Sequence, residues 1–210
     1  MTRARQALLG ALLLLAGLVA IAFRAPHPAV AAPGDKLASA VFAGGCFWCT
    51  ESDFDKIPGV VSTISGYAGG TAASATYAQV SAGGTGHIEV VKVVYDPAKV
   101  SYQRLVARFF RTIDPLDSGG QFCDRGSQYR SAIFVANAAE RRIAEATKAR
   151  AAALLKKPIA TQILPGAPFY AAEGYHQDYY KKNSTKYKYY RWRCGREARL
   201  SKVWGGSAGR

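Results

Sequence analysis

The chain has 210 residues, of which 49% are hydrophobic and 20% charged, as expected for one globular domain with extensions and a sizeable core. The net charge is +14, and residues 181–210 carry ten Lys or Arg against the single acidic residue Glu197. Such a segment can bind nucleic acid or acidic lipid, but the export signal described next argues against a nucleic-acid binder and favours a solvated basic surface. Four cysteines are too few for a disulfide-stapled scaffold, so thiol chemistry explains them better: Cys46, Cys49, Cys123 and Cys194.

The N-terminal residues have the pattern of a secretory signal. Arg3 and Arg5 precede an uncharged, mostly apolar run from residue 7 to residue 23, and Ala29-Val-Ala31 supplies small residues for cleavage after Ala31. The run is long for a signal and slightly short for a membrane span, so an uncleaved anchor is the alternative. We therefore expect a periplasmic or secreted protein, or one anchored in the membrane with its body on the non-cytoplasmic side.

Hydrophobic periodicity and turn signals predict alternating strands and helices after residue 37. Strands are expected at 38–42, 60–67, 87–95, 130–135 and 159–164, and helices at 46–57, 76–82, 101–113, 137–157 and 168–182. The order β-α-β-β-α-β corresponds to a ferredoxin-like α/β sandwich of the α+β class, with a mixed sheet, a C-terminal helix and an irregular tail. The expected segments are a signal peptide or anchor at 1–31, a linker at 32–36, a folded domain at 37–203 and a mobile tail at 204–210.

Residues 44–49 read Gly-Gly-Cys-Phe-Trp-Cys and place Cys46 where a strand passes into a helix. Unpaired N–H groups and the positive end of the helix dipole stabilise a thiolate there, so we expect the pKa of Cys46 to be lowered. The glycines let another molecule approach the backbone, and the rings of Phe47 and Trp48 suit a small apolar pocket. The alternative is a buried structural cysteine.

Glu89 is a second candidate, because it lies early in an apolar strand. Burial there would raise the pKa of its carboxyl and keep it protonated as an acid. A solvent-facing Glu on an amphipathic strand fits the same pattern equally well.

Two further segments are rich in polar or aromatic groups. The loop 114–131 carries more hydrogen-bonding groups than a connector needs, as binding loops do: Asp124, Arg125, Gln128, Tyr129 and Arg130. The segment 172–182 would place Tyr175 and Tyr179 on one helix face, with His176 and Tyr180 on the next. That spacing is more typical of an aromatic packing face than of a site.

Six motifs occur in order along the chain: Gly44-Gly-Cys-Phe-Trp48, Ser65-Gly-Tyr-Ala-Gly-Gly70, Thr85-Gly-His-Ile-Glu89, Tyr95-Asp-Pro97, Gln128-Tyr-Arg-Ser131 and Ala172-Glu-Gly-Tyr-His-Gln177. Together they resemble the peptide methionine sulfoxide reductase A family, from about residue 37 to about residue 182. One such motif is weak, but six in sequence are highly specific. The resemblance implies reduction of the S-epimer of methionine sulfoxide, free or in proteins, and hence repair of proteins after oxidative stress.

The resemblance also implies roles for individual residues. The roles are nucleophile for Cys46, acid for Glu89, contacts to the substrate's ε-methyl group for Phe47 and Trp48, contacts to the sulfoxide oxygen for Tyr77 and Tyr129, and a polar substrate-site aspartate for Asp124. Cys46 would become a sulfenic acid, a second thiol would condense with it to an intramolecular disulfide, and thioredoxin or a similar dithiol would reset the enzyme. No metal, organic cofactor or nucleic acid is implied, and a monomer is expected.

Several positions depart from the family pattern and leave the resolving thiol open. Cys49 stands where glycine is common, and Cys123 follows Gln121-Phe where many relatives have Arg-Gln-Gly. We favour Cys194 as the resolving thiol, because a flexible tail could carry it to Cys46. Cys49 is second, one helical turn from Cys46, and Cys123 is third.

Two other functions fit part of the pattern. The Cys46-Phe-Trp-Cys49 spacing suits a thioredoxin-like disulfide exchanger, which would need neither Glu89 nor the loop that carries Asp124 and Tyr129. A zinc site built on the same two cysteines lacks a second spaced pair of ligands and is a weak alternative.

Overall fold

The computed structural model describes residues 37–205 of the chain. The expected signal or anchor, the linker and residues 206–210 of the expected tail lie outside this range. None of the helices within it has the length and hydropathy that a membrane span requires.

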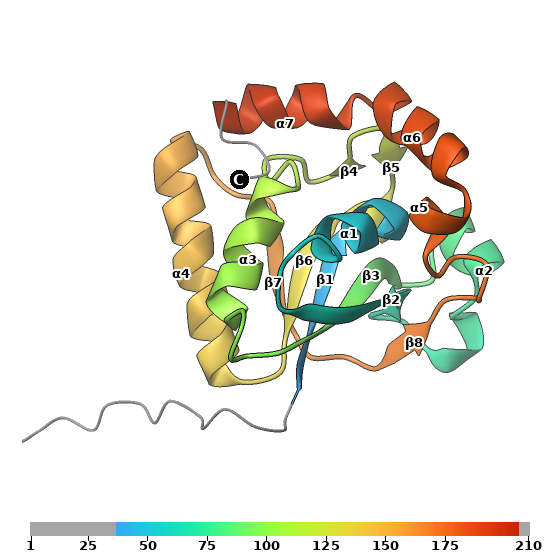
Figure 1. Ribbon diagram of the computed structural model, residues 1–210, viewed down its shortest axis with the longest axis horizontal. Coiled ribbons are helices and arrows are strands. Elements are labelled where there is room, and N and C mark those ends of the chain that lie inside the picture. Colours follow the sequence, from blue (N-terminus) through green and yellow to red (C-terminus); the bar gives the residue numbers. More distant parts are fainter. Residues whose placement is uncertain (1–36, 206–210) are drawn as a thin grey trace, which may run out of the picture. The chain divides into compact units, whose positions relative to one another are not determined.

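The described residues form one main sheet, a small hairpin and several helices (Figure 1). The main sheet contains β1 (Ala38–Gly44), β2 (Val60–Ala68), β3 (Ile88–Tyr95), β6 (Ser131–Val135), β7 (Gln162–Pro165) and β8 (Phe169–Ala171), and the hairpin pairs β4 (Gly120–Gln121) with β5 (Asp124–Arg125). The α-helices are α1 (Phe47–Phe54), α2 (Tyr77–Ala82), α3 (Tyr102–Arg111), α4 (Ala138–Leu155), α5 (Tyr179–Lys182), α6 (Ser184–Arg193) and α7 (Arg196–Trp204), and 3₁₀ turns occupy Ala72–Ser74 and Ser127–Tyr129.

The main sheet has the strand order β7-β6-β1-β3-β2-β8, so β1 and β3 are central. Within the described part of the chain, β6 and β7 pair in parallel and the other neighbours pair antiparallel. The fold is therefore α+β with a mixed sheet, as predicted. The chain order β1-α1-β2-β3-α3-β6 also matches the predicted β-α-β-β-α-β succession.

Helices α1 and α3 pack on the same face of the sheet because aromatic side chains interdigitate there. The ring of Phe42 on β1 lies 4.7 Å from that of Phe54 on α1 and 5.2 Å from that of Phe109 on α3. On β3, Val91 and Val93 join this core, whereas Ile88 and Val90 belong to a second cluster on the opposite face. The alternation expected for β3 is therefore present, and Glu89 points to the helix side.

The helix predicted at 168–182 is wrong for most of its length. Phe169–Ala171 instead forms β8 on the open edge of β2, with Ala171 opposite Gly66. Turns follow until Asp178, whose left-handed φ of 55° precedes the short helix α5. Backbone pairing with an unsatisfied sheet edge outweighs the weak helical pattern of this aromatic segment.

The C-terminal region is helical where the sequence predicts an irregular tail. Helix α6 carries lysines, arginines and tyrosines on all sides, so it lacks the apolar stripe that makes a helix visible in a sequence. Trp204, expected to begin the mobile tail, is buried at the end of α7, and its indole N–H donates to the carbonyl of Ile113 at 3.1 Å. Helices α6 and α7 lie next to the β4–β5 hairpin (Figure 1).

Two leucines on neighbouring helices test where the core lies. Leu105 on α3 is 0% exposed and Leu154 on α4 is 60% exposed. We expect Leu105→Ala to lower the free energy of unfolding by about 2–5 kcal/mol through lost burial and a cavity. The matched change Leu154→Ala stays within about 0.5 kcal/mol. Urea denaturation measures both, and equal losses would contradict the packing described.

Candidate active site

Cys46 is the N-cap of α1, directly after β1, as the sequence predicts. Two glycines make this junction possible, because a Cβ on Gly44 would lie 2.5 Å from Oγ1 of Thr50, and one on Gly45 would lie 2.5 Å from Cβ of Gln121. Gly45 also adopts a φ of 80°, in the region that favours glycine. The glycines thus admit neighbours from the same chain, and Cys46 is only 6% exposed.

The thiols of Cys46 and Cys49 interact across the first turn of α1. Burial, together with the hydrogen bond to Cys49, raises the pKa of Cys46, and the charges of Glu89 and Asp124 add to this. The hydrogen bond from Cys46 lowers the pKa of Cys49, which the guanidinium group of Arg196 lowers further. The prediction of a lowered pKa at Cys46 is therefore wrong in the substrate-free site, where burial outweighs the helix N-terminus.

Behind Cys49 lies a buried ionic cluster. Asp53 binds Nη1 of Arg191 at 2.8 Å and Nη2 of Arg196 at 3.4 Å. The Arg196 side chain is almost fully buried and also donates to the carbonyl of Thr112 at 2.6 Å. The cluster joins α1 to α6 and α7, so the C-terminal helices supply the positive charge next to Cys49.

Glu89 is buried, not on the solvent face of β3. It is 2% exposed, and its Oε2 accepts a hydrogen bond from the backbone N–H of Phe47 at 3.0 Å. Burial raises the pKa of the Glu89 carboxyl to about 8, although the Phe47 N–H opposes the shift. At neutral pH the group is therefore mainly protonated and can donate a proton beside Cys46.

The indole of Trp48 forms part of the site surface and is held on several sides. Its ring stacks on Tyr179 with centroids 3.8 Å apart and planes 8° apart. Its Nε1–H donates to Nδ1 of His176 at 3.0 Å, and the Tyr190 ring meets it edge-on at 5.9 Å. Phe47 is 1% exposed and packs against His176 at 4.9 Å, so it supports this wall from the core.

Tyr77, Tyr129 and Asp124 lie around the same point. Burial raises the pKa of each tyrosine hydroxyl, and the charge of Glu89 is the next cause for both. The charges of Cys46 and Asp124 also raise the pKa of both hydroxyls. All five groups therefore lie within electrostatic range of one another: Cys46, Glu89, Tyr77, Tyr129 and Asp124. Burial also raises the pKa of Asp124, against the hydrogen bond that it accepts from Tyr190. The structure thus brings the predicted site residues together.

The segment after β8 takes part in the site, although its spacing suggests a packing face. Glu173 accepts a hydrogen bond from the Tyr67 hydroxyl at 2.9 Å and from the backbone N–H of Tyr77 at 2.8 Å. His176 and Tyr179 hold Trp48, as described above. The sequence signal for this segment was its motif, Ala172-Glu-Gly-Tyr-His-Gln177, and not its periodicity.

His87, two residues before Glu89 in the motif Thr85-Gly-His-Ile-Glu89, has a structural role. Its Nδ1 accepts from the backbone N–H of Gly70 at 3.2 Å and its Nε2 lies 2.9 Å from the carbonyl of Thr71. Both ring nitrogens are therefore used to hold the loop after β2.

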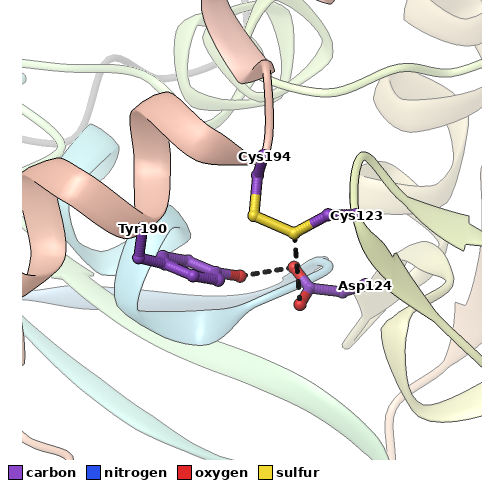
Figure 2. Close-up of a disulfide and its surroundings, with 4 residues drawn as sticks. All are labelled: Cys123, Asp124, Tyr190 and Cys194. Atoms are coloured by element: carbon purple, nitrogen blue, oxygen red, sulfur yellow. Dashed lines mark hydrogen bonds between the residues drawn. A yellow bond between two sulfur atoms is a disulfide. The ribbon is translucent and has the colours of Figure 1, made fainter.

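Cys123 and Cys194 form a disulfide across 71 residues (Figure 2). Cys194 is therefore not on a flexible tail but between α6 and α7, bonded to the β4–β5 turn. Among residues 37–205, Cys123, Asp124 and Cys194 are also the group whose ligand atoms lie close enough to hold a metal ion. Because the two sulfurs bond to each other, they offer no thiolates to a metal in this state.

A pair of adjacent thiols that faces a protonated carboxyl and two tyrosines defines a thiol-dependent oxidoreductase. The sequence profile of the family described as peptide methionine sulfoxide reductase matches residues 38–208. The chain is 53% identical over 183 residues to peptide methionine sulfoxide reductase MsrA 2 of Caulobacter vibrioides, with 87% of this chain and 92% of that protein covered. It is 47% identical to MsrA of Bacillus subtilis, with 81% and 98% covered.

Solved structures agree with the sequence relatives. Reduced Mxr1 of Saccharomyces cerevisiae superposes with a TM-score of 0.68 at 35% identity, covering 71% of this chain and 87% of Mxr1. Methionine sulfoxide reductase A of Corynebacterium diphtheriae gives a TM-score of 0.64 at 36% identity, covering 72% and 77%. The chain belongs to the peptide methionine sulfoxide reductase A family.

The buried carboxyl of Glu89 makes stability depend on pH. Its folded pKa of about 8 lies above the ordinary value of 4.5, so the native state retains a proton that the unfolded chain loses in this window. Stability conferred by the protonated carboxyl is present below the lower value and is lost as the pH rises through about 8. The free energy of unfolding of the wild type should therefore fall with rising pH, whereas that of Glu89→Gln should not fall for this reason. From acidic to alkaline pH, the difference should shift in favour of Glu89→Gln by about 2–4 kcal/mol.

Denaturant unfolding across the pH range measures this difference. The matched control is Glu145→Gln, which removes a carboxyl group that is 56% exposed on α4 and therefore lacks the burial of Glu89. A pH-independent difference between wild type and Glu89→Gln would contradict a protonated Glu89.

Proposed function

We propose that the protein reduces methionine-S-sulfoxide, free or in proteins, to methionine and thereby repairs oxidised proteins. The observation that carries this proposal is the placement of the protonated Glu89 carboxyl beside the Cys46 thiol. A sulfoxide oxygen is a strong hydrogen-bond acceptor and a poor leaving group, so its removal needs a nucleophile and a proton donor together. The family membership supports the same substrate.

In the first half-reaction, the Cys46 thiol gives its proton to water, and its sulfur then attacks the sulfoxide and takes the oxygen as the sulfur–oxygen bond of the substrate breaks. Charge that develops on the oxygen is stabilised by the Tyr77 and Tyr129 hydroxyls, and Glu89 delivers the proton. Methionine departs, Cys46 is left as a sulfenic acid and Glu89 as a carboxylate. The sulfoxide sulfur gains the two electrons that the Cys46 sulfur loses. A protonated Glu89 also removes one of the negative charges that oppose ionisation of Cys46.

For the second half-reaction, we propose Cys49 as the resolving thiol, in place of Cys194. Cys49 already contacts Cys46 and has the lowered pKa that favours attack. The Cys194 sulfur, favoured from the sequence, is engaged with Cys123. Attack of Cys49 on the sulfenic acid would form the Cys46–Cys49 disulfide and release water.

The reductant that resets the enzyme is proposed to be thioredoxin or a similar dithiol. Mxr1 of Saccharomyces cerevisiae has been solved in complex with Trx2, a structure with a TM-score of 0.50 to this chain at 26% identity. Two electrons and two protons from such a dithiol would convert a Cys46–Cys49 disulfide back to thiols. The cycle requires no metal and no organic cofactor.

Two further expectations stand as proposals. We place the protein outside the cytoplasm, either after cleavage of residues 1–31 or held by them as an anchor, on the strength of the basic and apolar pattern at the N-terminus. We also assign the core to the ferredoxin-like class, because β6-β1-β3-β2 is the order of the four strands in the β-α-β-β-α-β unit.

Turnover of the separated sulfoxide epimers with a dithiol tests the function. The wild type should reduce the S-epimer alone, Cys46→Ser should have no activity, and Glu89→Gln should lose about 10²–10⁴-fold in kcat. Methionine formation is measured by chromatography.

A thioredoxin-like exchanger gives a different pattern. It would reduce disulfides, spare activity in Glu89→Gln and lose activity in Cys49→Ser. Unchanged sulfoxide turnover in Cys46→Ser, or reduction of the R-epimer alone, would contradict the proposed function.

A single turnover without reductant tests the resolving thiol. With Cys123 and Cys194 bonded, the wild type should release one equivalent of methionine and form the Cys46–Cys49 disulfide. Cys49→Ser should also release one equivalent but retain a sulfenic acid at Cys46, which dimedone labels and mass spectrometry locates. A disulfide from Cys46 to Cys194 or Cys123 in the wild type would contradict the role of Cys49.

A further inference from the structure

Figure 2 shows four residues that form a closed circuit of contacts: Cys123, Asp124, Tyr190 and Cys194. Cys123 and Asp124 are consecutive residues of the β4–β5 hairpin, and Sγ of Cys123 lies 3.9 Å from Oδ1 of Asp124. The Tyr190 hydroxyl donates to Oδ2 of the same carboxylate. Cys194 closes the circuit, because it bonds to Cys123 and its backbone N–H donates to the carbonyl of Tyr190 at 3.0 Å.

This circuit fixes Tyr190 between two parts of the substrate site. Tyr190 and Cys194 are one helical turn apart at the end of α6, so a bond that holds Cys194 on the hairpin also holds Tyr190 over Asp124. The ring of Tyr190 also meets that of Trp48 edge-on. Movement of Tyr190 would therefore affect the polar and the aromatic wall of the site together.

Asp124 depends on this contact. Its carboxylate is partly buried, which raises its pKa, and the Tyr190 hydroxyl is the first group that opposes the shift. A half-buried carboxylate that loses its donor bears the cost of unpaired charge or takes up a proton. Either change would alter a group aimed at the substrate.

We propose that Tyr190 is a positioning residue for the substrate site and that the Cys123–Cys194 disulfide is the redox-sensitive clamp that holds it there. The proposal rests on the function proposed above, because it takes Asp124 and Trp48 to bind methionine sulfoxide, as the family resemblance implies. With the disulfide closed, Tyr190 orders both groups. With it open, the end of α6 is released from the hairpin and the affinity for substrate falls, while the chemistry at Cys46 is retained.

The disulfide is placed where a dithiol can reach it. Cys123 is exposed, and Cys194 borders two surface pockets of about 580 and 470 Å³. An external dithiol would break the sulfur–sulfur bond by exchange, give two electrons and two protons to form the thiols of Cys123 and Cys194, and itself become a disulfide. The buried thiols, Cys46 at 6% and Cys49 at 2% exposure, are far less accessible.

Binding measured without turnover tests the clamp. Cys46→Ser protein cannot form the sulfenic acid, so its affinity for N-acetyl-methionine-S-sulfoxide can be measured without turnover. Isothermal titration calorimetry gives this affinity with the Cys123–Cys194 disulfide closed, then reduced by dithiothreitol, and then reoxidised. We expect reduction to weaken binding by about 3–10-fold and reoxidation to restore it. Tyr190→Phe in the same background should bind as weakly as the reduced protein and no longer respond to reduction.

The matched control is Tyr189→Phe, because Tyr189 is 59% exposed on the same helix and should retain both affinity and redox response. In single turnovers without reductant, where the Cys123–Cys194 disulfide stays closed, Tyr190→Phe alone should raise the substrate concentration for half-maximal rate by about 3–10-fold and leave the maximal rate within about twofold, which a general loss of structure would not do.

Equal affinity in the oxidised and reduced states overturns the clamp, and wild-type affinity in Tyr190→Phe overturns the role of Tyr190. Circular dichroism of the reduced protein monitors its fold. If reduction unfolds the chain, the affinity of Tyr190→Phe protein, which retains the disulfide, decides the outcome. A failure of oxidised Cys46→Ser protein to bind the S-epimer at all would instead contradict the proposed function.

Discussion

The hydrogen bond between the backbone N–H of Phe47 and the carboxyl of Glu89 is the contact on which the site depends. It joins the first turn of α1 to β3, and the strands before and after α1 in the chain, β1 and β2, both pair with β3. The same bond orients a carboxyl that burial keeps protonated. One interaction thus holds the first turn of α1, which Cys46 precedes as N-cap, against the carboxyl that we propose as the proton donor.

The remaining parts of the site come from segments that wrap around this junction. The loop after β8 supplies His176, which holds Trp48, and α6 supplies Tyr190, which holds Asp124. The half-buried Arg191 of α6 and the buried Arg196 of α7 bind Asp53 on α1 and place positive charge next to Cys49. The two thiols are therefore electrostatically unequal, because the pKa of Cys46 is raised and that of Cys49 is lowered.

The strands and helices of the core, and the junction between β1 and α1 at Cys46, could be predicted because short sequence patterns specify them. Alternation in β3, the apolar stripe of α3 and the glycine pair before Cys46 each specify structure within a few residues. The strand β8 could not be predicted, because it exists only to pair with the open edge of β2. The burial of Glu89 was ambiguous for the same reason, since the strand pattern alone does not say which helices cover it.

The raised pKa of Cys46 shows that tertiary structure can outweigh the effect of a helix N-terminus. A helix N-terminus favours a thiolate, but the tertiary structure surrounds this sulfur with aromatic rings and two carboxyl groups, which act in the opposite direction. Helix α6 was missed because its buried residue is Tyr187, and tyrosine among lysines and arginines reads as surface in a sequence. Helix α7 buries Arg196, Leu200 and Trp204, so its apolar signal is only two residues.

The most direct test of this account is a titration of the Glu89 carboxyl carbon by ¹³C NMR in substrate-free protein, with Glu89→Gln used to assign the resonance. The account predicts a midpoint at a pH of about 8. A midpoint at the ordinary value for glutamate, about 4.5, would show an ionised carboxylate beside Cys46 at neutral pH and would remove the proposed proton donor.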